Sequence, residues 1–313
     1  MDARTPRLSI VIVNWNAAAR LRGCLASLRP QCGPDVELVV VDNGSSDDSL
    51  AVVRSAWPEA VIVSLATNRG FAEGCNRGLA VARGAWVLTL NNDTVVRPGF
   101  IDGLLEAADA APEDVGMLQP RLLLEGGVRL NSTGVLVHRD GSAHDRDFDA
   151  PLADRTDGDE ILCVTAGAGL YRRTMLDRIR VEADWFDPAY FMYFEDVDLG
   201  WRARLAGWRA LYIPEPTVEH AFQGSSRKHG RHFVTIQCMR NRVRTLLKNA
   251  SWRMIARSLP RSASDLLWLL QHAGGRALAD WALAVRDGLR ARPAVTRLAG
   301  TDRRDLERRW VLP

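Results

Sequence analysis

Short apolar runs alternate with segments of helical periodicity through the first 100 residues. Four runs have the length of a strand and are almost entirely apolar, with many β-branched side chains. Between them apolar residues recur three or four positions apart, as Leu21, Leu25 and Leu28 do, which is the spacing of one helix face. This alternation predicts an α/β fold with a mainly parallel central sheet and helices on both faces. The apolar runs are residues 8–13, 37–41, 60–65 and 85–90.

Polar residues follow directly after these predicted strands and interrupt none of them. Asn14 follows the first strand and Asp42 the second. The polar groups 68–70 and 91–93 follow the third and the fourth. Because ligands of such sheets bind beyond the carboxyl ends of the strands, this pattern predicts a binding site at that edge.

The pattern changes in the second half of the chain. Residues 126–159 are rich in Gly, Asp, Arg and His and contain short β-like pieces such as 134–138, which predicts an irregular excursion across the sheet. Strand-like sequence returns at 161–164 and 210–213, and from about residue 231 the pattern is helical and rich in arginine. We therefore expect a sheet-based domain over residues 1–230 and a helical C-terminal region over 231–313.

Composition narrows the class of protein. The chain has 313 residues, of which 47% are hydrophobic and 25% charged, an ordinary globular balance. Its formal net charge of +3 argues against a broad nucleic-acid-binding surface. Only two of the 41 basic residues are lysine, Lys228 and Lys248. Local anionic partners, such as phosphates or acidic headgroups, remain possible.

Cysteine usage and hydropathy bear on the compartment. The five cysteines are scattered and form no CxxC pair, which argues against a disulfide framework or a zinc ribbon and predicts reduced thiols. Residues 1–7 are polar, unlike a secretion signal. The chain contains no run of 18 apolar residues, which is the length that a membrane-spanning helix requires, so the sequence predicts no such helix. We expect a cytoplasmic chain.

Two acidic clusters are candidates for chemistry. Asp93, preceded by Asn91 and Asn92, suits a divalent cation that also binds a diphosphate, although such clusters are also common in turns. Glu195 and Asp196 follow a run of aromatic residues. Partial desolvation there would raise a carboxyl pKa and suit a general base. The same acids would also favour a helix N-terminus through its dipole.

These clusters occur in order with other short blocks and with His220, which follows a predicted strand. By these blocks the chain resembles glycosyltransferase family 2, inverting enzymes of the GT-A fold, and especially its bacterial rhamnosyltransferase-like members. The resemblance covers roughly residues 7–250. The blocks are residues 9–16, 41–47, 68–72 with 74–78, 90–94, 166–168 and 194–199.

The resemblance implies a role for each matching residue. Asp196 would be the catalytic base, with Glu195 as the alternative. Asp93 would hold Mg²⁺ or Mn²⁺ on the donor diphosphate, and His220 would complete the metal site, as it does in some members. The residues implied at the nucleotide are Asn14, Asp42 (bonded to the base), Arg69, Asn76 and Asn92. Those implied at the sugar or acceptor pocket are Ala166, Gly167 and Trp185.

The same resemblance implies the substrates. A sugar, with rhamnose as the candidate, would pass from a dTDP-, UDP- or GDP-linked donor to a hydroxyl of a cell-envelope glycan or lipid-linked acceptor. A cation on the phosphate side and a base on the opposite side suit in-line attack with inversion. One departure from the family is the pair of amides at Asn91 and Asn92, where many relatives carry an acid, which lowers the negative charge around the cation.

The C-terminal region combines arginine with leucine and tryptophan over residues 240–290. This pattern is typical of helices at the surface of an anionic membrane, and equally of a helical hairpin packed on the catalytic domain or on a second subunit. The basic run 227–232 suits either a mobile lid over the diphosphate or a solvated loop. The sequence leaves the oligomeric state open.

Two other functions remain open at this point. One is a non-catalytic nucleotide-sugar-binding or scaffold protein on the same fold, against which the retained Asp93, Asp196 and His220 argue. The other is a sugar-phosphate nucleotidyltransferase, which would need a glycine-rich basic loop after the first strand. Residues 14–17 are not such a loop.

Overall fold

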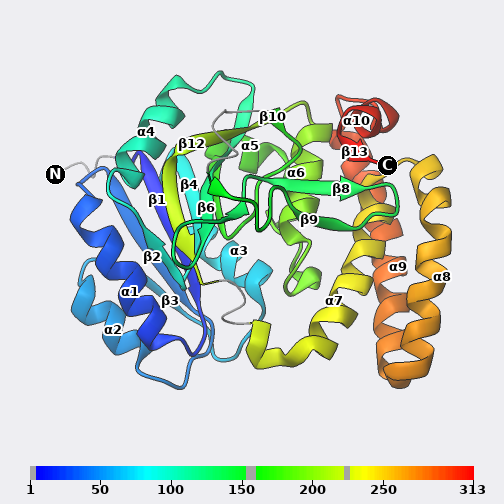
Figure 1. The fold of residues 1–313 in the computed structure, drawn as a ribbon, viewed down its shortest axis with the longest axis horizontal. Helices are drawn as coiled ribbons and strands as arrows, with labels where there is room; N and C mark the ends of the chain where they lie inside the picture. Colours follow the sequence, from blue (N-terminus) through cyan, green and yellow to red (C-terminus); the bar gives the residue numbers. More distant parts are fainter. Residues whose placement is uncertain (1–4, 153–159, 222–225) are drawn as a thin grey trace.

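Parallel strands at the N-terminal side of the sheet confirm the predicted alternation. The computed structural model describes residues 5–152, 160–221 and 226–313, without side-chain positions for 226–229. In it β1 pairs in parallel with both β2 and β4, and β2 pairs in parallel with β3 (Figure 1). The strands are β1 (Leu8–Asn14), β2 (Val36–Asp42), β3 (Val61–Ser64) and β4 (Trp86–Asn91).

Helices cover both faces of this sheet. Along β1, Ile10 and Ile12 pack with α1, α2 and α4, whereas Val11 between them packs with α3, α5 and α6. Successive side chains of a strand point to opposite faces, so a continuous apolar run is what a doubly covered strand requires. The helices are α1 (Ala18–Leu28), α2 (Ser49–Ala56), α3 (Phe71–Val81), α4 (Phe100–Ala110), α5 (Arg173–Arg178) and α6 (Glu195–Leu205).

The other half of the sheet is mixed. β11 runs antiparallel to its two neighbours β4 and β6, and β12 runs parallel to β6. β12 continues to His220 and pairs there with the short β5 beside Asp93. This pairing places His220, at the end of β12, beside the loop after β4 that contains Asp93. The bounds are β5 (Thr94–Val96), β6 (Val115–Leu124), β10 (Glu160–Ile161), β11 (Ala168–Arg172) and β12 (Arg209–His220).

The excursion contains paired strands, one of which, β8, matches the β-like piece expected at 134–138. β8 and β9 form a hairpin, and the C-terminal strand β13 pairs in parallel with β8. The partner strands β7 and β9 are only three residues long, too short for a hydrophobic pattern to reveal them. Part of the excursion, 153–159, lies outside the described residues. The strands are β7 (Leu130–Ser132), β8 (Val135–His138), β9 (Ala143–Asp145) and β13 (Val311–Leu312).

The C-terminal helices pack against the catalytic domain. α7 contacts α6, α8 and α9, and α9 also contacts α6. Trp201 of α6 shares an apolar core with Leu246, Met254 and Val295. The predicted boundary at residue 230 falls on a break within α7, where Gly230 has a φ of 79°. The helices are α7 (Ser226–Asn249), α8 (Trp252–His272), α9 (Gly274–Leu298) and α10 (Arg303–Trp310).

Candidate active site

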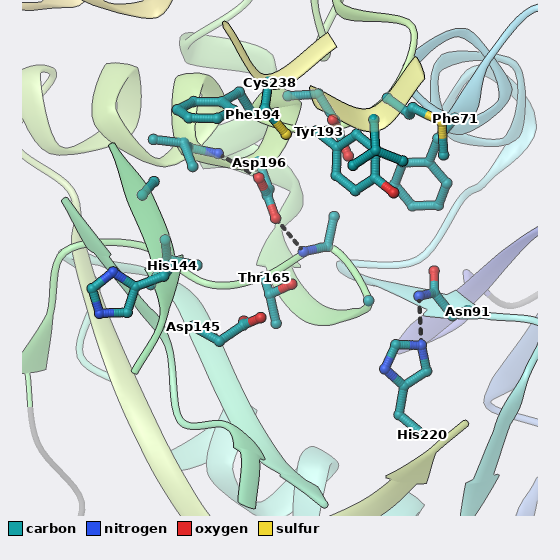
Figure 2. A pocket seen from close by; sticks show the side chains of 18 of the residues that line it. Phe71, Asn91, His144, Asp145, Thr165, Tyr193, Phe194, Asp196, His220 and Cys238 are labelled. Atoms are coloured by element: carbon teal, nitrogen blue, oxygen red, sulfur yellow. Dashed lines mark hydrogen bonds between the residues drawn. The ribbon is translucent and has the colours of Figure 1, made fainter. Parts of the chain in front are cut away.

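A cleft of about 1060 Å³ lies at the carboxyl ends of β1 and β4. Its walls come from the strand-end loop after β4, the turn before β11, the β8–β9 hairpin and the N-terminal parts of α6 and α7 (Figure 2). The structure thus brings together segments far apart in the sequence. Of the residues predicted for the site, Asn92, Asp93, Ala166, Gly167, Glu195, Asp196 and His220 line this cleft.

Asp93 and His220 meet at one end of the cleft. The Oδ1 atom of Asp93 lies 3.1 Å from Nε2 of His220. The Nδ1 atom of His220 lies 2.7 Å from Oδ1 of Asn131. An amide oxygen can only accept, so the contact with Asn131 places a proton on Nδ1. Asn91 Nδ2 also lies 3.1 Å from Nε2; when Nε2 is unprotonated, its one lone pair can accept from Asn91 or bind a cation in its place.

Two acceptor atoms therefore converge at Asp93 and His220, which fits a divalent cation. Cis ligands of an octahedral ion at about 2.1 Å are about 3 Å apart, close to the separation seen here. Among the described residues no three His, Cys, Asp or Glu side chains form a metal group. That agrees with Mg²⁺-type sites, which use one or two protein ligands and complete the shell with substrate phosphates and water. The hydrogen bond from His220 to Asn131 would hold the ring in the ligating tautomer.

Asn14 connects this end of the cleft to the loop after β2. Its Oδ1 accepts from Asn92 Nδ2 at 2.7 Å, and its own Nδ2 donates to Ser45 Oγ at 3.3 Å. Asp42 pairs with Asn14 in the β1–β2 register. The Oδ2 atom of Asp42 accepts from Ser45 N at 3.4 Å, whereas its buried Oδ1 has no partner among the described residues. A buried acceptor without a donor suits an N–H of a ligand.

Arg69 belongs to the loop after β3, which is fastened to the loop after β2. Its backbone N–H donates to Oδ1 of Asn43 at 2.9 Å. The amide of Asn43 donates in turn to Asn68 and to the carbonyl of Gly70, at 3.1 and 3.0 Å. Asn43, which was not singled out from the sequence, thus clamps two strand-end loops together beside Asp42.

Asn76 and Trp185 do not belong to the cleft lining among the described residues. The side chain of Asn76 donates to the carbonyl of Phe186 at 2.7 Å and accepts from its N–H at 2.9 Å. The indole N–H of Trp185 donates to Asp177 at 3.3 Å, and Arg180 lies over its ring. Both side chains thus hold residues 185–186 in place, and the nucleotide contact expected of Asn76 and the sugar contact expected of Trp185 stay predictions.

The acid pair Glu195–Asp196 begins α6 and occupies the opposite side of the cleft from His220 (Figure 2). Asp196 accepts hydrogen bonds from the N–H groups of Ala166 at 3.1 Å and Val197 at 2.8 Å. Burial raises the pKa of Asp196, and these hydrogen bonds oppose the rise. Its carboxyl thus combines a raised pKa with donors that support the ionised form, as a general base requires.

Glu195 is in a different environment. It is 6% exposed, and its Oε2 has no hydrogen-bond partner among the described residues. Burial raises the pKa of Glu195 well above its usual range, and the neighbouring charge of Asp196 raises it further. Two adjacent buried carboxyls cannot both ionise readily. The backbone donors at Asp196 favour that residue as the ionised member, and so favour it over Glu195 as the base.

The segment before this pair is strained and held from the C-terminal region. Phe191 and Phe194 have φ values of 62° and 69°, a region that side-chain-bearing residues seldom adopt. The amide group of Asn241 in α7 spans this turn. It donates to the carbonyls of Tyr190, Met192 and Tyr193 at 3.0, 2.8 and 2.8 Å. The C-terminal region therefore fixes the segment that leads into the Glu195–Asp196 pair.

A buried ionic network continues this connection. The Nζ atom of Lys248 in α7 lies 2.9 Å from Asp187 and 2.8 Å from Asp198 of α6. Asp198 also pairs with Arg202, four residues further along α6, at 3.0 Å. Lys248 and Asp198 side chains are fully buried. The last part of the chain is thus bonded to the helix that begins with the acid pair.

Two residues of the cleft were missed by sequence reasoning. Asn131 orients His220, and Asp145 lines the cleft from β9. Both lie in the excursion at residues 126–159, where no apolar periodicity marks a strand. Asn131 also begins an N-x-S/T tripeptide, the pattern of a glycosylation site, which gives no indication that this residue contacts His220. No local signal in the sequence distinguishes either residue from the surrounding polar ones.

Comparison with known protein families shows to which family of enzymes the chain belongs. Residues 9–180 match the family described as Glycosyl transferase family 2. The chain belongs to this family. Its members are glycosyltransferases, and the matched range contains β1 to β4 together with the strand-end loops that carry Asp42 and Asp93.

Among curated relatives of this family 2 chain are two mycobacterial glycosyltransferases. The chain is 28% identical over 243 residues to an N-acetylglucosaminyl-diphospho-decaprenol L-rhamnosyltransferase of Mycobacterium tuberculosis, covering 69% of this chain and 76% of that protein. It is 36% identical over 192 residues to a PGL/p-HBAD biosynthesis glycosyltransferase of Mycobacterium bovis, covering 58% of this chain and 67% of that protein.

Solved structures of glycosyltransferases share the fold. The mannosyltransferase PcManGT from Pyrobaculum calidifontis, in complex with GDP-Man and Mn²⁺, has a TM-score of 0.55 at 18% identity, over 94% of this chain and 86% of that one. TarS 1–349 of S. aureus, in complex with UDP-GlcNAc, has a TM-score of 0.60 at 17% identity, over 94% and 84%. The GT-A-type fold with C-terminal helices is thus confirmed. In the described part of this glycosyltransferase, no helix is both long and apolar enough to cross a membrane.

Proposed function

We propose that this glycosyltransferase is inverting and uses a divalent cation, Mg²⁺ or Mn²⁺, with a dTDP-, UDP- or GDP-linked sugar donor. The proposal rests on the separation of two groups of side chains within the cleft. Asp93 and His220 converge at one end, and Asp196 lies across from them (Figure 2). If the donor diphosphate binds beside Asp93 and His220, the anomeric carbon of the donor sugar would lie between the cation and the base, as in-line displacement requires.

The proposed reaction is a single displacement. Asp196 accepts the proton of the acceptor hydroxyl as that oxygen forms the new bond to the anomeric carbon. The bond from the anomeric carbon to the diphosphate oxygen breaks, and the nucleoside diphosphate leaves with the bonding electrons. A cation held by Asp93 and His220 would supply Lewis-acid neutralisation of the diphosphate. Hydrogen bonds from Ala166 and Val197 hold the carboxylate of Asp196 in place.

Asp42 and Asn14 would bind the nucleotide. The unpartnered Oδ1 of Asp42 would accept from the base, and Asn14 would keep that loop in register with Asn92. Arg69, in the clamped neighbouring loop, would lie near ribose or phosphate. Ala166 and Gly167 would border the sugar.

The acceptor we propose is a lipid-linked glycan intermediate of the cell envelope, and rhamnose is the candidate sugar. The relative in Mycobacterium tuberculosis described above is an N-acetylglucosaminyl-diphospho-decaprenol L-rhamnosyltransferase, a name that specifies a lipid-linked acceptor. A chain acting on such an acceptor in the cytoplasm would need contact with the bilayer surface.

Helix α8 offers a surface for that contact. It forms the outer edge of the molecule in Figure 1. Leu259, Leu267 and Leu270 recur at helical spacing and are 60%, 55% and 59% exposed. The exposed Arg253 and Arg257 lie on the same helix. Exposed leucines combined with arginines match the chemistry of an anionic membrane, to which we assign this face.

We expect the chain to float with vesicles containing anionic phospholipid in a density gradient. The double variant Leu267→Glu/Leu270→Glu should bind such vesicles at least about tenfold more weakly, because two apolar contacts are lost and two negative charges are added. Val128→Glu, at a valine that is 70% exposed on the catalytic domain, is the matched control. A wild-type chain that stays in solution with every anionic vesicle would rule out this surface.

Asp93→Ala tests the cation site directly. In wild type we expect Mn²⁺ to strengthen binding of the matching nucleoside diphosphate, measured by calorimetry with and without the metal. In the variant this enhancement should fall by about tenfold or more, since one of two protein ligands is gone. Asp102→Ala, a substitution in the first turn of α4, is the control. An unchanged enhancement in Asp93→Ala would remove Asp93 from the metal site.

Turnover tests the function as a whole. Incubation with Mn²⁺ and dTDP-rhamnose, UDP-GlcNAc or GDP-mannose should release the nucleoside diphosphate from at least one donor, by slow hydrolysis or by transfer. Binding without turnover across donors and acceptors would favour the alternative of a non-catalytic nucleotide-sugar-binding protein.

A further inference from the structure

The β8–β9 hairpin brings a third carboxylate into the cleft. Asp145 ends β9 and lines the cleft, as Ala143 and His144 before it also do. Figure 2 shows the Asp145 carboxylate pointing towards Thr165, with the His144 ring turned the other way. This alternation is that of a strand, whose successive side chains point to opposite faces.

Asp145 faces the cleft from the side of the β8–β9 hairpin. Figure 2 shows its carboxylate beside Thr165, below Asp196 and to the left of His220. Burial raises the pKa of Asp145 to about 6; a hydrogen bond from Ser132 and the charge of His220 oppose the rise, and the charge of Asp196 adds to it. A sugar transferred between Asp93 and Asp196 would lie in the cleft that Asp145 also lines.

The hairpin is anchored along the edge of β8 that faces away from β9. Val135 of β8 donates its N–H to the carbonyl of Cys163 at 3.0 Å, next to the turn that carries Ala166. Further along the same edge, Val311 and Leu312 of β13 pair with β8, and the backbone N–H of Arg139 donates to the carbonyl of Leu312 at 3.0 Å. Figure 1 shows the C-terminus beside β8. A strand fixed in this way presents its side chain in a defined position.

We propose that Asp145 binds a hydroxyl of the transferred sugar and thereby contributes to donor selectivity. This inference rests on the proposed function. A carboxylate accepts hydrogen bonds from sugar hydroxyls, whereas it would repel the diphosphate. An acid at this position therefore recognises the sugar part of the donor and not its nucleotide. The base role belongs to Asp196, whose carboxylate is held by two backbone N–H donors.

The test compares two dissociation constants measured by calorimetry with Mn²⁺. One is for a nucleotide sugar, chosen from dTDP-rhamnose, UDP-GlcNAc and GDP-mannose as the one that wild type binds most tightly. The other is for the corresponding nucleoside diphosphate. In Asp145→Ala the affinity for the nucleotide sugar should fall about 10- to 100-fold relative to the nucleoside diphosphate, the range for a lost hydrogen bond to a charged group.

Asp145→Asn keeps the shape of the side chain and should show a smaller loss in the same ratio. Asp149→Asn makes the same charge change in the same segment, at an exposed residue paired with Arg129, and should leave the ratio unchanged. Unchanged affinity for the nucleoside diphosphate in each variant shows that the cleft is intact.

Several outcomes would overturn the assignment. If wild type favours a nucleotide sugar and Asp145→Ala keeps the same ratio, Asp145 does not bind the donor sugar. A defect confined to transfer, with normal donor affinity, would assign Asp145 to the acceptor and overturn the proposal. If wild type binds no nucleotide sugar and turns none over, the proposed function itself fails, and this inference fails with it.

Discussion

Asp196→Asn should lower kcat by about 10²- to 10⁴-fold, the usual contribution of a positioned general base. The amide cannot take the acceptor proton, yet it keeps the size of the carboxylate. Binding of the nucleoside diphosphate, measured by calorimetry, should be unchanged because Asp196 lies across the cleft from Asp93 and His220. Equal turnover by wild type and variant would exclude Asp196 as the base.

Glu195→Gln is the matched control for this experiment. Burial, with the charge of Asp196 adding to it, raises the pKa of Glu195 well above its usual range, which favours the neutral form of this residue. An amide of the same size should therefore reduce kcat far less than Asp196→Asn does. A larger loss in Glu195→Gln than in Asp196→Asn would reverse the assignment of the base.

The raised pKa of Asp196 also shapes the pH profile of wild type. A general base acts only when it is ionised, so kcat/KM falls as the pH drops through its pKa. Since burial raises that pKa above the value of about 4 for an ordinary aspartate, the fall should begin at a higher pH than it would for an exposed carboxyl.

Lys248→Met should lower the free energy of unfolding by about 3–5 kcal/mol, because it leaves buried carboxylates without their shared cation. Lys248 contacts Asp187 and Asp198 at 2.9 and 2.8 Å with no exposed side-chain surface. Chemical denaturation followed by circular dichroism measures the loss. Arg308→Met removes a cation from an exposed ion pair with Asp305 and should change stability by less than about 1 kcal/mol. Equal effects would show that the buried network contributes no more than a surface pair.

The same network gives a pH dependence with a defined sign. Burial alone would raise the pKa of Asp187, but Lys248 and Arg244 outweigh it and lower that pKa. A carboxyl whose pKa is lowered by folding stabilises the protein above the unfolded pKa of about 4, and this stability is lost as the pH falls below it. The unfolding free energy of wild type should therefore drop steeply in acid. The drop should be shallower in Lys248→Met, because part of the stabilisation is already gone.

Local patterns were enough to predict the first half of the site. The strands β1 to β4 follow from continuous apolar runs, and Asn14, Asp42 and Asp93 follow from their place at strand ends. Their positions relative to one another need only the rule that the carboxyl ends of parallel strands meet at one edge. The Asp198–Arg202 pair follows from an equally local rule, since residues four apart on a helix are neighbours.

Residue type alone does not show whether a side chain faces the cleft or packs inside the domain. The resemblance implies that Asn76 and Trp185 lie at the sugar nucleotide, and in the structure both are bonded to their neighbours. Whether such a side chain turns inward depends on which segment packs against it, and the sequence does not contain that information locally.

The sequence by itself determined the α/β class and the position of Asp42 and Asp93 at the carboxyl-end edge of the sheet, because both depend on short-range spacing. Only the tertiary structure decided that Asn131 orients His220 across 89 residues, that Asp145 enters the cleft and that Lys248 joins the C-terminal helices to α6. Each of these is a contact between polar residues of distant segments. Such contacts form only after the apolar faces have packed, so no periodicity in the chain records them.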